Sequence, residues 1–472
     1  MLLMRFVALL LGAVSGPAAS LVAQAEPLDS VARYIAGVMQ RQKIPGLSVA
    51  ILRGDSVVLA RGYGFANLEH RVPASDSTVY QSGSLGKQFT ATAVGMLARQ
   101  GRLSVDDRIT KWFPEGKGVW DSITVRQLLT HTSGVPDYTD SLIDLRKDYT
   151  EDQMVRLAAG QPLDFPAGDS WSYSNTGYLL LGVLIHRVTG RFYGDVLHEM
   201  LFKPLGMETR IISEADIIPH RADGYRLVEG KLNNQEWVSP SLNTTADGAL
   251  YLTVNDLAKW AVALNHRRLP SAPVLDEAWT PARLNDGSDF PYGYGWDLAA
   301  QRAYRRIGHT GSWQGFKTAI YRYPEFDLTV IALANLAEAT PGPIAQGIAG
   351  IIEPALQPPE LFTAALGGPA PPVAVATLLR RLAAGKEAGM VARGARRHLL
   401  PAAQRQLPET LKGTGWWTAL GCEAPWGGTA RWLGADAVRV CYARGGGTSD
   451  RAVASVYYTG DWKVAYFDVV NY

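Results

Sequence analysis

The chain has few cysteines, almost no net charge and few long apolar runs. Forty-six basic residues balance 44 acidic ones to a net charge of +2, so no global field favours nucleic acid or an anionic membrane. Its only two cysteines lie near the C-terminus. At 472 residues and 47% hydrophobic composition, the chain is long enough for two or three globular domains and is not a disordered protein.

Two common hydrolase signatures are also missing. None of the eight histidines stands in a His-Glu-x-x-His arrangement or another spacing typical of metal ligands, which gives a zinc hydrolase no support. A Gly-x-Ser-x-Gly nucleophile turn is absent, which argues against an α/β-hydrolase. The sequence therefore predicts neither a metal nor another cofactor.

The N-terminus has the layout of a cleavable secretory signal. Residues 1–25 contain an early Arg5, an apolar run at Phe6–Val14 and a small-residue end at Ala23-Gln24-Ala25. The run is too short to span a bilayer as a stable helix, and no cysteine follows it for a lipid anchor. We therefore expect an exported protein, periplasmic or extracellular, that is cleaved near Ala25 and has no membrane span.

Export bears on the two cysteines, Cys422 and Cys441, which lie 19 residues apart. An oxidising compartment favours a disulfide between them, confined to the last domain. Two unpaired buried thiols are the alternative, because a sequence does not show whether the two Cα atoms approach closely enough.

The apolar pattern predicts an α+β protein. A helical pattern covers residues 28–42, and residues 46–67 contain two apolar runs around a Gly-Asp turn, which indicates a β-hairpin. A second strand-rich block covers residues 302–336, and helical segments such as Thr176–Val188 lie between the two blocks. The simplest assembly joins both blocks in one antiparallel sheet with flanking helices, beside an inserted helical domain, with a cleft where sheet and helices meet.

The composition divides the chain further. After the signal, residues 26–355 form the main predicted domain, and the proline- and glycine-rich residues 356–375 suit a linker. Residues 376–472 begin with a helical stretch and continue with alternating, strand-like runs joined by glycine-rich turns. We therefore expect a small α+β accessory domain at the C-terminus, with nothing in it that looks catalytic.

The first candidate for chemistry is Ser84 with Lys87, three residues apart at the start of an apolar helix. Residues at this spacing lie on one face of a helix, so an ammonium or amine is placed beside a hydroxyl. A nearby base activates a serine nucleophile, and the helix N-terminus offers backbone N–H groups to an oxyanion. The alternative is a helix-capping serine followed by a surface lysine.

Two further segments add polar groups. Tyr173 and Asn175 stand two residues apart and project to the same side of an extended segment, although Asn175 is also a good N-cap for the helix that follows. His309 and Gly311 lie on a predicted strand, with Ser312 next, and the glycine permits a close approach of a substrate to the backbone.

Together and in this order, these residues resemble the serine β-lactamase and penicillin-binding-protein superfamily, in particular the branch shared by class C β-lactamases, D-aminopeptidases, DD-peptidases and esterases. Its three motifs are Ser-x-x-Lys, Tyr-x-Asn and Lys-Thr-Gly or His-x-Gly. The flanking text "RGYGFAN", "LLTHTSGVPDY", "ADGALYLTVNDLAKW" and "YGYGW" is similar to the family as well. The resemblance covers residues 27 to 355 and implies a β-lactamase/transpeptidase-like fold with a five-stranded antiparallel sheet.

The resemblance also implies a role for each residue. Ser84 is the expected nucleophile, Lys87 and Tyr173 the proton-accepting pair, and Asn175 a hydrogen-bonding group that positions lysine and substrate. Tyr173 can accept a proton at neutral pH only if a nearby cation favours its ionised form, and Lys87 is the candidate. The backbone N–H groups of Ser84 and Ser312 are expected to hold the oxyanion, and His131, in "LLTHTSG", is expected to be structural.

The departure from the family is His309, which stands where β-lactamases and DD-peptidases usually have a lysine that binds the substrate carboxylate. A histidine carries only partial charge at pH 7, so β-lactams are expected to be poor substrates. The sequence therefore predicts an exported serine hydrolase that cleaves an ester or amide in a small molecule or peptide. A catalytically silent protein that binds cell-wall peptide or another ligand in the same cleft is the alternative.

Overall fold

The computed structural model describes residues 17–139, 143–210, 216–357, 366, 368–386, 388–412, 414–425, 430–432, 435–446 and 451–471. Most of the predicted signal, residues 1–16, and most of the first half of the predicted linker therefore lie outside the described residues. Within the described parts, no helix is long and apolar enough to cross a membrane.

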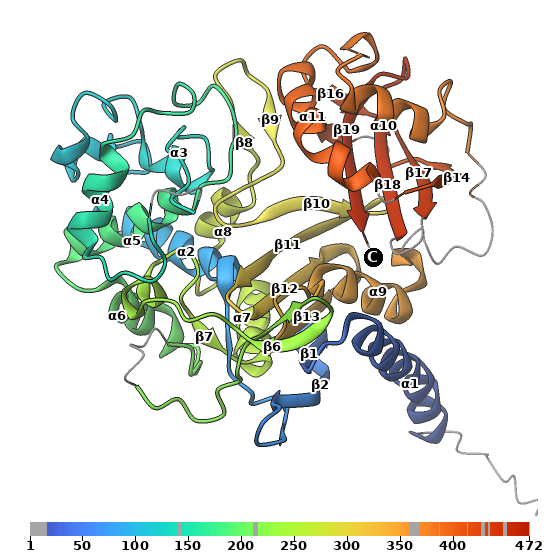
Figure 1. Cartoon of the computed structure of the whole chain (residues 1–472), viewed down its shortest axis with the longest axis horizontal. Coiled ribbons are helices and arrows are strands. Elements are labelled where there is room, and N and C mark those ends of the chain that lie inside the picture. Colours follow the sequence, from blue (N-terminus) through green and yellow to red (C-terminus); the bar gives the residue numbers. More distant parts are fainter. Residues whose placement is uncertain are drawn as a thin grey trace, which may run out of the picture.

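One large antiparallel sheet organises the first three quarters of the chain (Figure 1). Its strands run in the order β10-β11-β12-β13-β1-β2-β3, so the early hairpin and the late strand block share one sheet, as the sequence predicted. The sheet has seven strands where five were expected, because two short strands, β3 and β10, extend its edges. The bounds are β1 Gly46–Arg53, β2 Ser56–Asn67, β3 Val72–Pro73, β10 Asp297–Gln301, β11 Tyr304–Trp313, β12 Phe316–Tyr323 and β13 Leu328–Ala334.

The first and the last long stretches of chain that form the sheet meet at its centre. β1 pairs with β13, with Ile51 opposite Val330, although the two residues are far apart in sequence. Both strands are rich in valine, isoleucine, leucine and alanine and are buried along almost their whole length. A strand with this composition is covered on both faces, so the sheet must lie between two layers of helices.

Helices cover both faces of the sheet. On one face, α1 (Pro17–Gln42) and α9 (Pro341–Ile352) pack together, and Ile35 and Ile348 are fully buried in the apolar cluster that they share with the strands. On the other face lies α7 (Val254–His266), whose Trp260 belongs to a second, larger cluster. This larger cluster continues from the sheet into the helical region, so the two parts share one core.

The helical region is inserted between β3 and β10 in the sequence and lies beside the sheet in Figure 1. Its helices are α2 Lys87–Arg99, α3 Val125–Leu129, α4 Glu151–Ala159, α5 Asn175–Thr189, α6 Tyr193–Leu197 and α8 Ala272–Ala278. Short two-stranded pairs connect them: β4 Tyr80–Gln81 with β7 Tyr251–Leu252, β5 Tyr225–Val228 with β6 Lys231–Asn234, and β8 Ala282–Arg283 with β9 Asp289–Phe290.

The C-terminal unit has its own α+β core. Two helices, α10 (Val375–Ala383) and α11 (Arg396–Lys412), pack against a four-stranded antiparallel sheet. A disulfide joins Cys422 and Cys441, which stand opposite each other on neighbouring strands. The strands are β14 Trp416–Glu423, β17 Arg439–Gly446, β18 Arg451–Tyr458 and β19 Val464–Asn471, with a separate pair β15 Ala430–Trp432 and β16 Ala435–Ala437.

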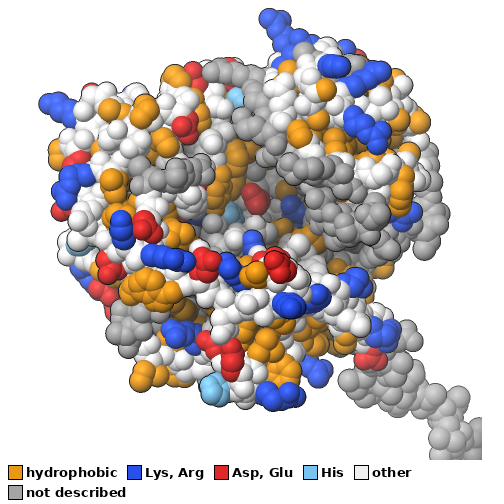
Figure 2. Space-filling view, viewed as in Figure 1, with side chains coloured by type: hydrophobic (Ala, Val, Ile, Leu, Met, Phe, Trp, Pro, Cys, Tyr) orange, Lys and Arg blue, Asp and Glu red, His pale blue; other side chains and the backbone are white. Residues whose placement is uncertain are grey.

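The C-terminal unit contacts the edge of the large sheet. Arg302, just after β10, forms an ion pair at 2.7 Å with Glu423, which also accepts a hydrogen bond from the Tyr442 hydroxyl. Phe290 of β9 packs against the apolar core of the C-terminal unit. Figure 2 shows a hollow at the centre of this face of the molecule, between the helical region and the C-terminal unit.

Candidate active site

Ser84 lies in a tight turn between β4 and α2. A 3₁₀ turn, Gly83–Gly86, carries the serine and runs into α2 at Lys87. Gly83 has a φ of +54°, and a Cβ built on it would lie 2.5 Å from the backbone nitrogen of Ser312. Glycine is required here because both the backbone conformation and the contact disfavour a side chain. The turn is therefore held directly against strand β11.

The ammonium or amine nitrogen of Lys87 lies at the centre of the site. Nζ is 3.1 Å from Ser84 Oγ, 2.7 Å from Asn175 Oδ1 and 2.8 Å from the backbone oxygen of Asp247. The two carbonyl oxygens can only accept hydrogen bonds, so they take two N–H groups of the lysine. The third position on Nζ faces Ser84 Oγ. In a neutral amine this position holds a lone pair, which can accept the serine proton.

The surroundings of Lys87 make that neutral form more accessible than in an exposed lysine. Burial lowers the pKa of Lys87 to about 8, although the carboxylates of Asp247 and Asp137 oppose the shift. The whole residue is inaccessible to solvent. At a pKa of about 8, about a tenth of the lysines are neutral at pH 7 and about half at pH 8. A surface lysine, the alternative reading of this motif, is therefore wrong.

Asn175 holds the lysine from the start of α5. Ser174, not Asn175, caps this helix, because its Oγ accepts a hydrogen bond from the backbone N–H of Gly177. The capping alternative for Asn175 is therefore wrong. Its Oδ1 accepts from Lys87 and its Nδ2 donates to Asp137 Oδ2 at 2.9 Å. These two contacts fix the orientation of the amide, since each requires a different end of it.

Tyr173 lies above the lysine and is partly exposed, although its hydroxyl oxygen is buried. Lys87 Nζ lies 4.9 Å from the centre of the Tyr173 ring, and the tyrosine hydroxyl has no hydrogen-bond partner among the described residues. Burial raises the pKa of Tyr173 well above its usual value, with the nearby Ser84 hydroxyl opposing the shift. The tyrosine therefore keeps its proton at neutral pH. The expectation that Lys87 stabilises a tyrosinate stays a prediction.

His309, Gly311 and Ser312 lie at an open edge of the large sheet. β10 pairs only with residues 304–308 of β11, so residues 309–313 have no strand beside them on that side among the described strands. A Cβ on Gly311 would lie 2.0 Å from the backbone oxygen of Ser82, so this glycine allows β11 to approach the turn that carries Ser84.

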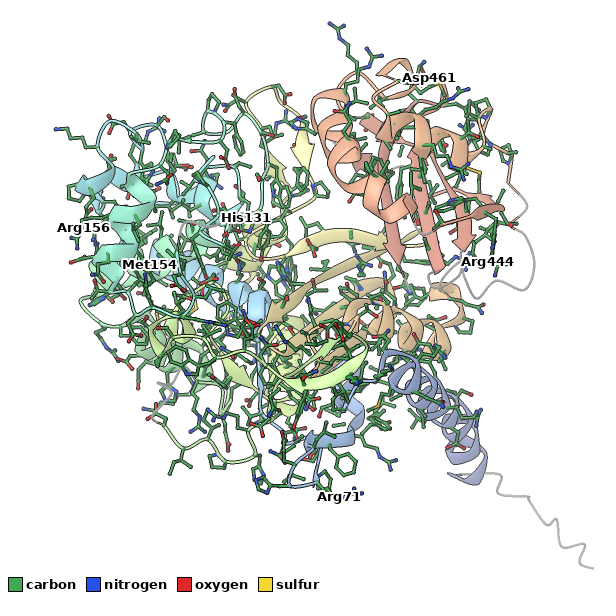
Figure 3. All side chains as sticks on the ribbon, viewed as in Figure 1. Arg71, His131, Met154, Arg156, Arg444 and Asp461 are labelled. Carbon is green, nitrogen blue, oxygen red and sulfur yellow. A yellow bond between two sulfur atoms is a disulfide. The ribbon has the colours of Figure 1, made fainter. Side chains whose placement is uncertain are left out.

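Two histidines are joined through a tyrosine beside this edge. The Tyr292 hydroxyl lies 3.2 Å from His131 Nε2 and 2.9 Å from His309 Nε2. The backbone N–H of Ser174 donates to His131 Nδ1 at 3.1 Å, and His309 Nδ1 contacts the backbone oxygen of Thr310. His131 lies on the side of the helical region that faces the sheet (Figure 3). It is buried and fixed by its neighbours, as expected of a structural residue.

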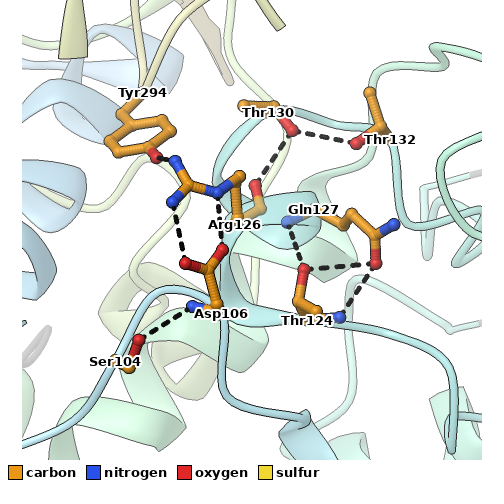
Figure 4. A network of polar contacts seen from close by, with 8 residues as sticks. All are labelled: Ser104, Asp106, Thr124, Arg126, Gln127, Thr130, Thr132 and Tyr294. Atoms are coloured by element: carbon orange, nitrogen blue, oxygen red, sulfur yellow. Dashed lines mark hydrogen bonds and ion pairs between the residues drawn. The ribbon is translucent and has the colours of Figure 1, made fainter. Parts of the chain in front are cut away.

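A polar network positions the loop before His131 (Figure 4). The Arg126 guanidinium forms an ion pair with Asp106 at 2.8 Å and also donates to the Tyr294 hydroxyl. Because Tyr294 lies two residues after Tyr292, this network ties α3 and the His131 loop to the segment that carries Tyr292.

Sequence reasoning missed three of these residues. Asp137, Asp247 and Tyr292 all lie within flanking text that resembles the family, but no spacing rule connects any of them with Lys87 or His309. The described residues contain no group of three or more histidine, cysteine, aspartate or glutamate side chains that could hold a metal ion.

The comparison with known families decides the membership of the chain. The family model described as Beta-lactamase matches residues 31–349, which is more than half of the chain. The chain belongs to the Beta-lactamase family. The matched residues include all the motif residues described above, from Ser84 to Ser312. This confirms the predicted superfamily, while the class C branch stays a prediction.

Relatives of this Beta-lactamase family chain include penicillin-binding proteins and an amidase. Penicillin-binding protein 4* of Bacillus subtilis is 30% identical over 311 residues, which cover 62% of this chain and 68% of the relative. The D-amino acid amidase of Ochrobactrum anthropi SV3 is 25% identical, with a TM-score of 0.59, over 69% of this chain and 98% of the amidase. These similarities support a serine hydrolase of the β-lactamase fold.

A third similarity extends into the C-terminal unit. The octameric penicillin-binding protein homologue from Pyrococcus abyssi has a TM-score of 0.64 and covers 94% of this chain and 95% of its own length. Its sequence identity is 23%, so this likeness concerns the fold alone. It confirms the α+β class predicted for the chain, with a C-terminal sheet unit after the β-lactamase-like part.

Proposed function

We propose that the chain is an exported serine hydrolase that cleaves an ester or amide bond through an acyl-enzyme on Ser84. The observation that carries the proposal is the contact between Lys87 Nζ and Ser84 Oγ at 3.1 Å, made by a buried lysine whose other N–H groups are already bound. A binding protein has no need for an amine whose remaining position faces a serine hydroxyl.

In the first half of the reaction, neutral Lys87 accepts the proton of Ser84 while Oγ forms a bond to the substrate carbonyl carbon. The negative charge that develops on the carbonyl oxygen is held by the backbone N–H groups of Ser84 and Ser312. The close packing of Gly83 on Ser312 supports this pairing, because it brings the two backbone segments together.

In the second half, the leaving group departs with a proton and water releases the acyl group. The Tyr173 hydroxyl, which holds its proton and has no partner among the described residues, donates it to the leaving group and regains one from the Lys87 ammonium. Lys87 is then neutral again and accepts a proton from the attacking water, and it returns this proton to Ser84 Oγ as the bond between Oγ and the acyl carbon breaks. Within the proton-accepting pair, Lys87 is the base and Tyr173 carries the proton to the leaving group.

The proposed substrate is an ester or amide in a small molecule or peptide. The relationship to a D-amino acid amidase and to penicillin-binding protein 4* supports acyl-transfer chemistry of this kind. His309 replaces the lysine usual in β-lactamases, so we propose that β-lactams are poor substrates. The proposal also divides the chain into parts. Residues 1–25 are cleaved, residues 26–355 form the catalytic domain, residues 356–375 are a linker and residues 376–472 form an accessory domain.

The test is the intact mass of the mature protein after incubation with a fluorophosphonate and, separately, with a penicillin. We expect one fluorophosphonate adduct on the wild type and none on Ser84→Ala. Ser82→Ala is the matched control, because Ser82 lies two residues away and its hydroxyl donates to the backbone oxygens of Gly83 and Gly248. This variant should still react.

The incubation with penicillin distinguishes a β-lactam substrate from other esters and amides. A slow or absent penicillin adduct beside a rapid fluorophosphonate adduct agrees with the proposed preference for esters and amides. If folded wild-type protein reacts with neither reagent, the hydrolase proposal is wrong and the silent binding protein becomes the better account.

A further inference from the structure

The hydrogen bonds around His131, Tyr292 and His309 determine where their protons lie. The Ser174 N–H donates to His131 Nδ1, so this nitrogen carries no proton and His131 is neutral with its proton on Nε2. That proton is donated to the Tyr292 oxygen, 3.2 Å away. At the other end, the Thr310 carbonyl can only accept, so His309 Nδ1 carries a proton.

The remaining proton belongs to the Tyr292 hydroxyl. Its oxygen already accepts from His131, and His309 Nε2 lies 2.9 Å away. The Tyr178 hydroxyl is also near, but it donates its own proton to the Leu129 carbonyl. Because the unprotonated nitrogen of an imidazole is a stronger acceptor than a phenol oxygen, Tyr292 donates to His309 Nε2. Every donor in this row of hydrogen bonds, from Ser174 to Thr310, then has an acceptor, and both histidines are neutral.

The charged groups around His309 agree with this arrangement. Burial lowers the pKa of His309, and the positive charge of Lys87 lowers it further, while Asp297 on β10 opposes both. His131 and Tyr173 contribute no charge at neutral pH, because burial lowers the pKa of the histidine and raises that of the tyrosine. Asp297 and the Thr310 carbonyl, which accepts a hydrogen bond from Nδ1, both favour a protonated His309, against the effects of burial and of Lys87.

Lys317 does not supply a positive charge for a substrate carboxylate on the face of the sheet where His309 lies. Its Nζ donates to Ser312 Oγ at 2.8 Å, and the two residues stand opposite each other on β12 and β11. Because successive side chains of a strand alternate between faces, Ser312 and Lys317 point to the face opposite His309 and Gly311. Lys87 does not supply this charge either, because its Nζ already contacts Ser84, Asn175 and Asp247.

We infer that Tyr292 is a specificity-determining residue, because its hydroxyl holds His309 as the neutral Nδ1–H tautomer and so selects substrates without a carboxylate beside the scissile bond. This inference rests on the proposed function and names its substrate class: esters or amides with no carboxylate beside the scissile bond. A carboxylate at the β11 edge meets a histidine with no net charge. In Tyr292→Phe the donor to Nε2 is lost, so His309 can be protonated more easily and a carboxylate is better accepted.

The first test reads the tautomer directly. The full mature chain is labelled with [¹⁵N]histidine, and the His309 signals are assigned from their absence in His309→Gln. Between pH 6 and 8 we expect the shifts of a neutral Nδ1–H imidazole. Tyr292→Phe should raise the pH at which His309 titrates. Tyr294→Phe is the matched control, because it loses the same hydroxyl two residues away, where the partner is Arg126, and should leave the titration unchanged.

The second test compares two p-nitrophenyl esters, one with a neutral acyl chain and one of equal length that ends in a carboxylate. We expect wild type to prefer the neutral ester by about tenfold or more in kcat/KM at pH 7, since a hydrogen bond to a charged group is worth about 1.5–3 kcal/mol. In Tyr292→Phe the preference should shrink at pH 6 and not at pH 9. His309→Gln, neutral at every pH, should keep the preference without pH dependence.

The outcomes separate this inference from the proposed function. A protonated His309 or an Nε2–H tautomer at pH 7, or a titration that Tyr292→Phe does not move, overturns the inference even if both esters are hydrolysed. The inference is also wrong if wild type hydrolyses both esters equally well and Lys317→Gln prefers the neutral ester, because Lys317 is then the carboxylate-binding group. Failure of Ser84 to react with fluorophosphonate overturns the proposed function, whereas the histidine signals are read without any turnover.

Discussion

The apolar interior of the large sheet-containing unit and that of the C-terminal unit differ in the polar groups that they bury beside apolar side chains. The core of the large unit encloses Lys87, His131, His309 and Asp247, each less than 5% exposed. The core of the C-terminal unit consists mainly of valine, leucine, alanine and aromatic side chains, with a disulfide across two of its strands, and the buried polar side chains described in this unit are His398 and Thr414. Burying a charged or polar group costs stability unless it is paired. Buried charged and polar groups, which lower stability unless they are paired, are concentrated in the core where the chemistry is proposed. The core of the C-terminal unit is mainly apolar.

The largest effect should come from removing the buried amine. Lys87→Met keeps the apolar stem and deletes the nitrogen that faces Ser84 Oγ. Loss of a general base costs about 10³-fold or more, so we expect kcat/KM for a p-nitrophenyl ester to fall at least that far. Circular dichroism and thermal melting check that the variant is folded. Activity within tenfold of wild type would remove Lys87 from the mechanism.

A smaller but still large effect is expected from the turn that carries Ser84. Gly83→Ala combines a positive φ with a clash against the backbone of Ser312. Displacing reacting groups by about 1 Å can cost about 100-fold in rate, and we expect a loss of that order. Gly190→Ala is the matched control: its φ is +73°, but nothing lies within 4 Å of the added Cβ. It should cost about 1–2 kcal/mol in unfolding free energy and leave kcat/KM unchanged.

A carboxylate in place of the Asn175 amide should shift the pH dependence. In Asn175→Asp, a new negative charge beside Nζ favours the ammonium and raises the pKa of Lys87, by about one unit or more. Because the neutral amine is the active form, kcat/KM at pH 7 should fall about tenfold. Raising the pH to 9.5 should restore most of the rate. A loss that is equal at every pH would show damage to the site instead of a shifted base.

The smallest effect on catalysis should come from the C-terminal unit. Replacing both Cys422 and Cys441 by alanine removes the cross-strand disulfide, which typically costs about 2–4 kcal/mol of stability. We expect earlier unfolding in urea with kcat/KM within about twofold of wild type. If the rate constants fall in parallel with stability, the C-terminal unit supports the site more directly than the comparison of the two cores implies.

Much of the fold followed from the sequence because its signals are local. The apolar runs at 46–67 and 302–336 predicted the hairpin and the late strands, and the helix predicted at Thr176–Val188 is α5, Asn175–Thr189. The edge strands β3 and β10 were missed, since two and five residues give little periodicity. Ser174 was missed as the cap of α5 because both it and Asn175 are good capping residues, and only the backbone decides between them.

The candidate site was predictable in its residues and less so in its electrostatics. Ser84, Lys87, Tyr173 and Asn175 were found because their motifs, in this order, resemble the family, and the structure brings them together. Burial could not be seen in sequence, so the direction in which the pKa of Tyr173 moves was not foreseen. Tyr292 comes to lie between His131 and His309 through tertiary packing of segments that are far apart in the chain.

The most direct test of the central claim, that buried Lys87 in its neutral form activates Ser84, is the pH dependence of fluorophosphonate labelling. The second-order rate constant for wild type is measured from pH 5 to 10, at constant ionic strength, by intact mass. The pKa of about 8 predicts a rate that rises about tenfold per pH unit at low pH and levels off above pH 8. A rate that does not change with pH, or one that still rises steeply at pH 10, would contradict the account.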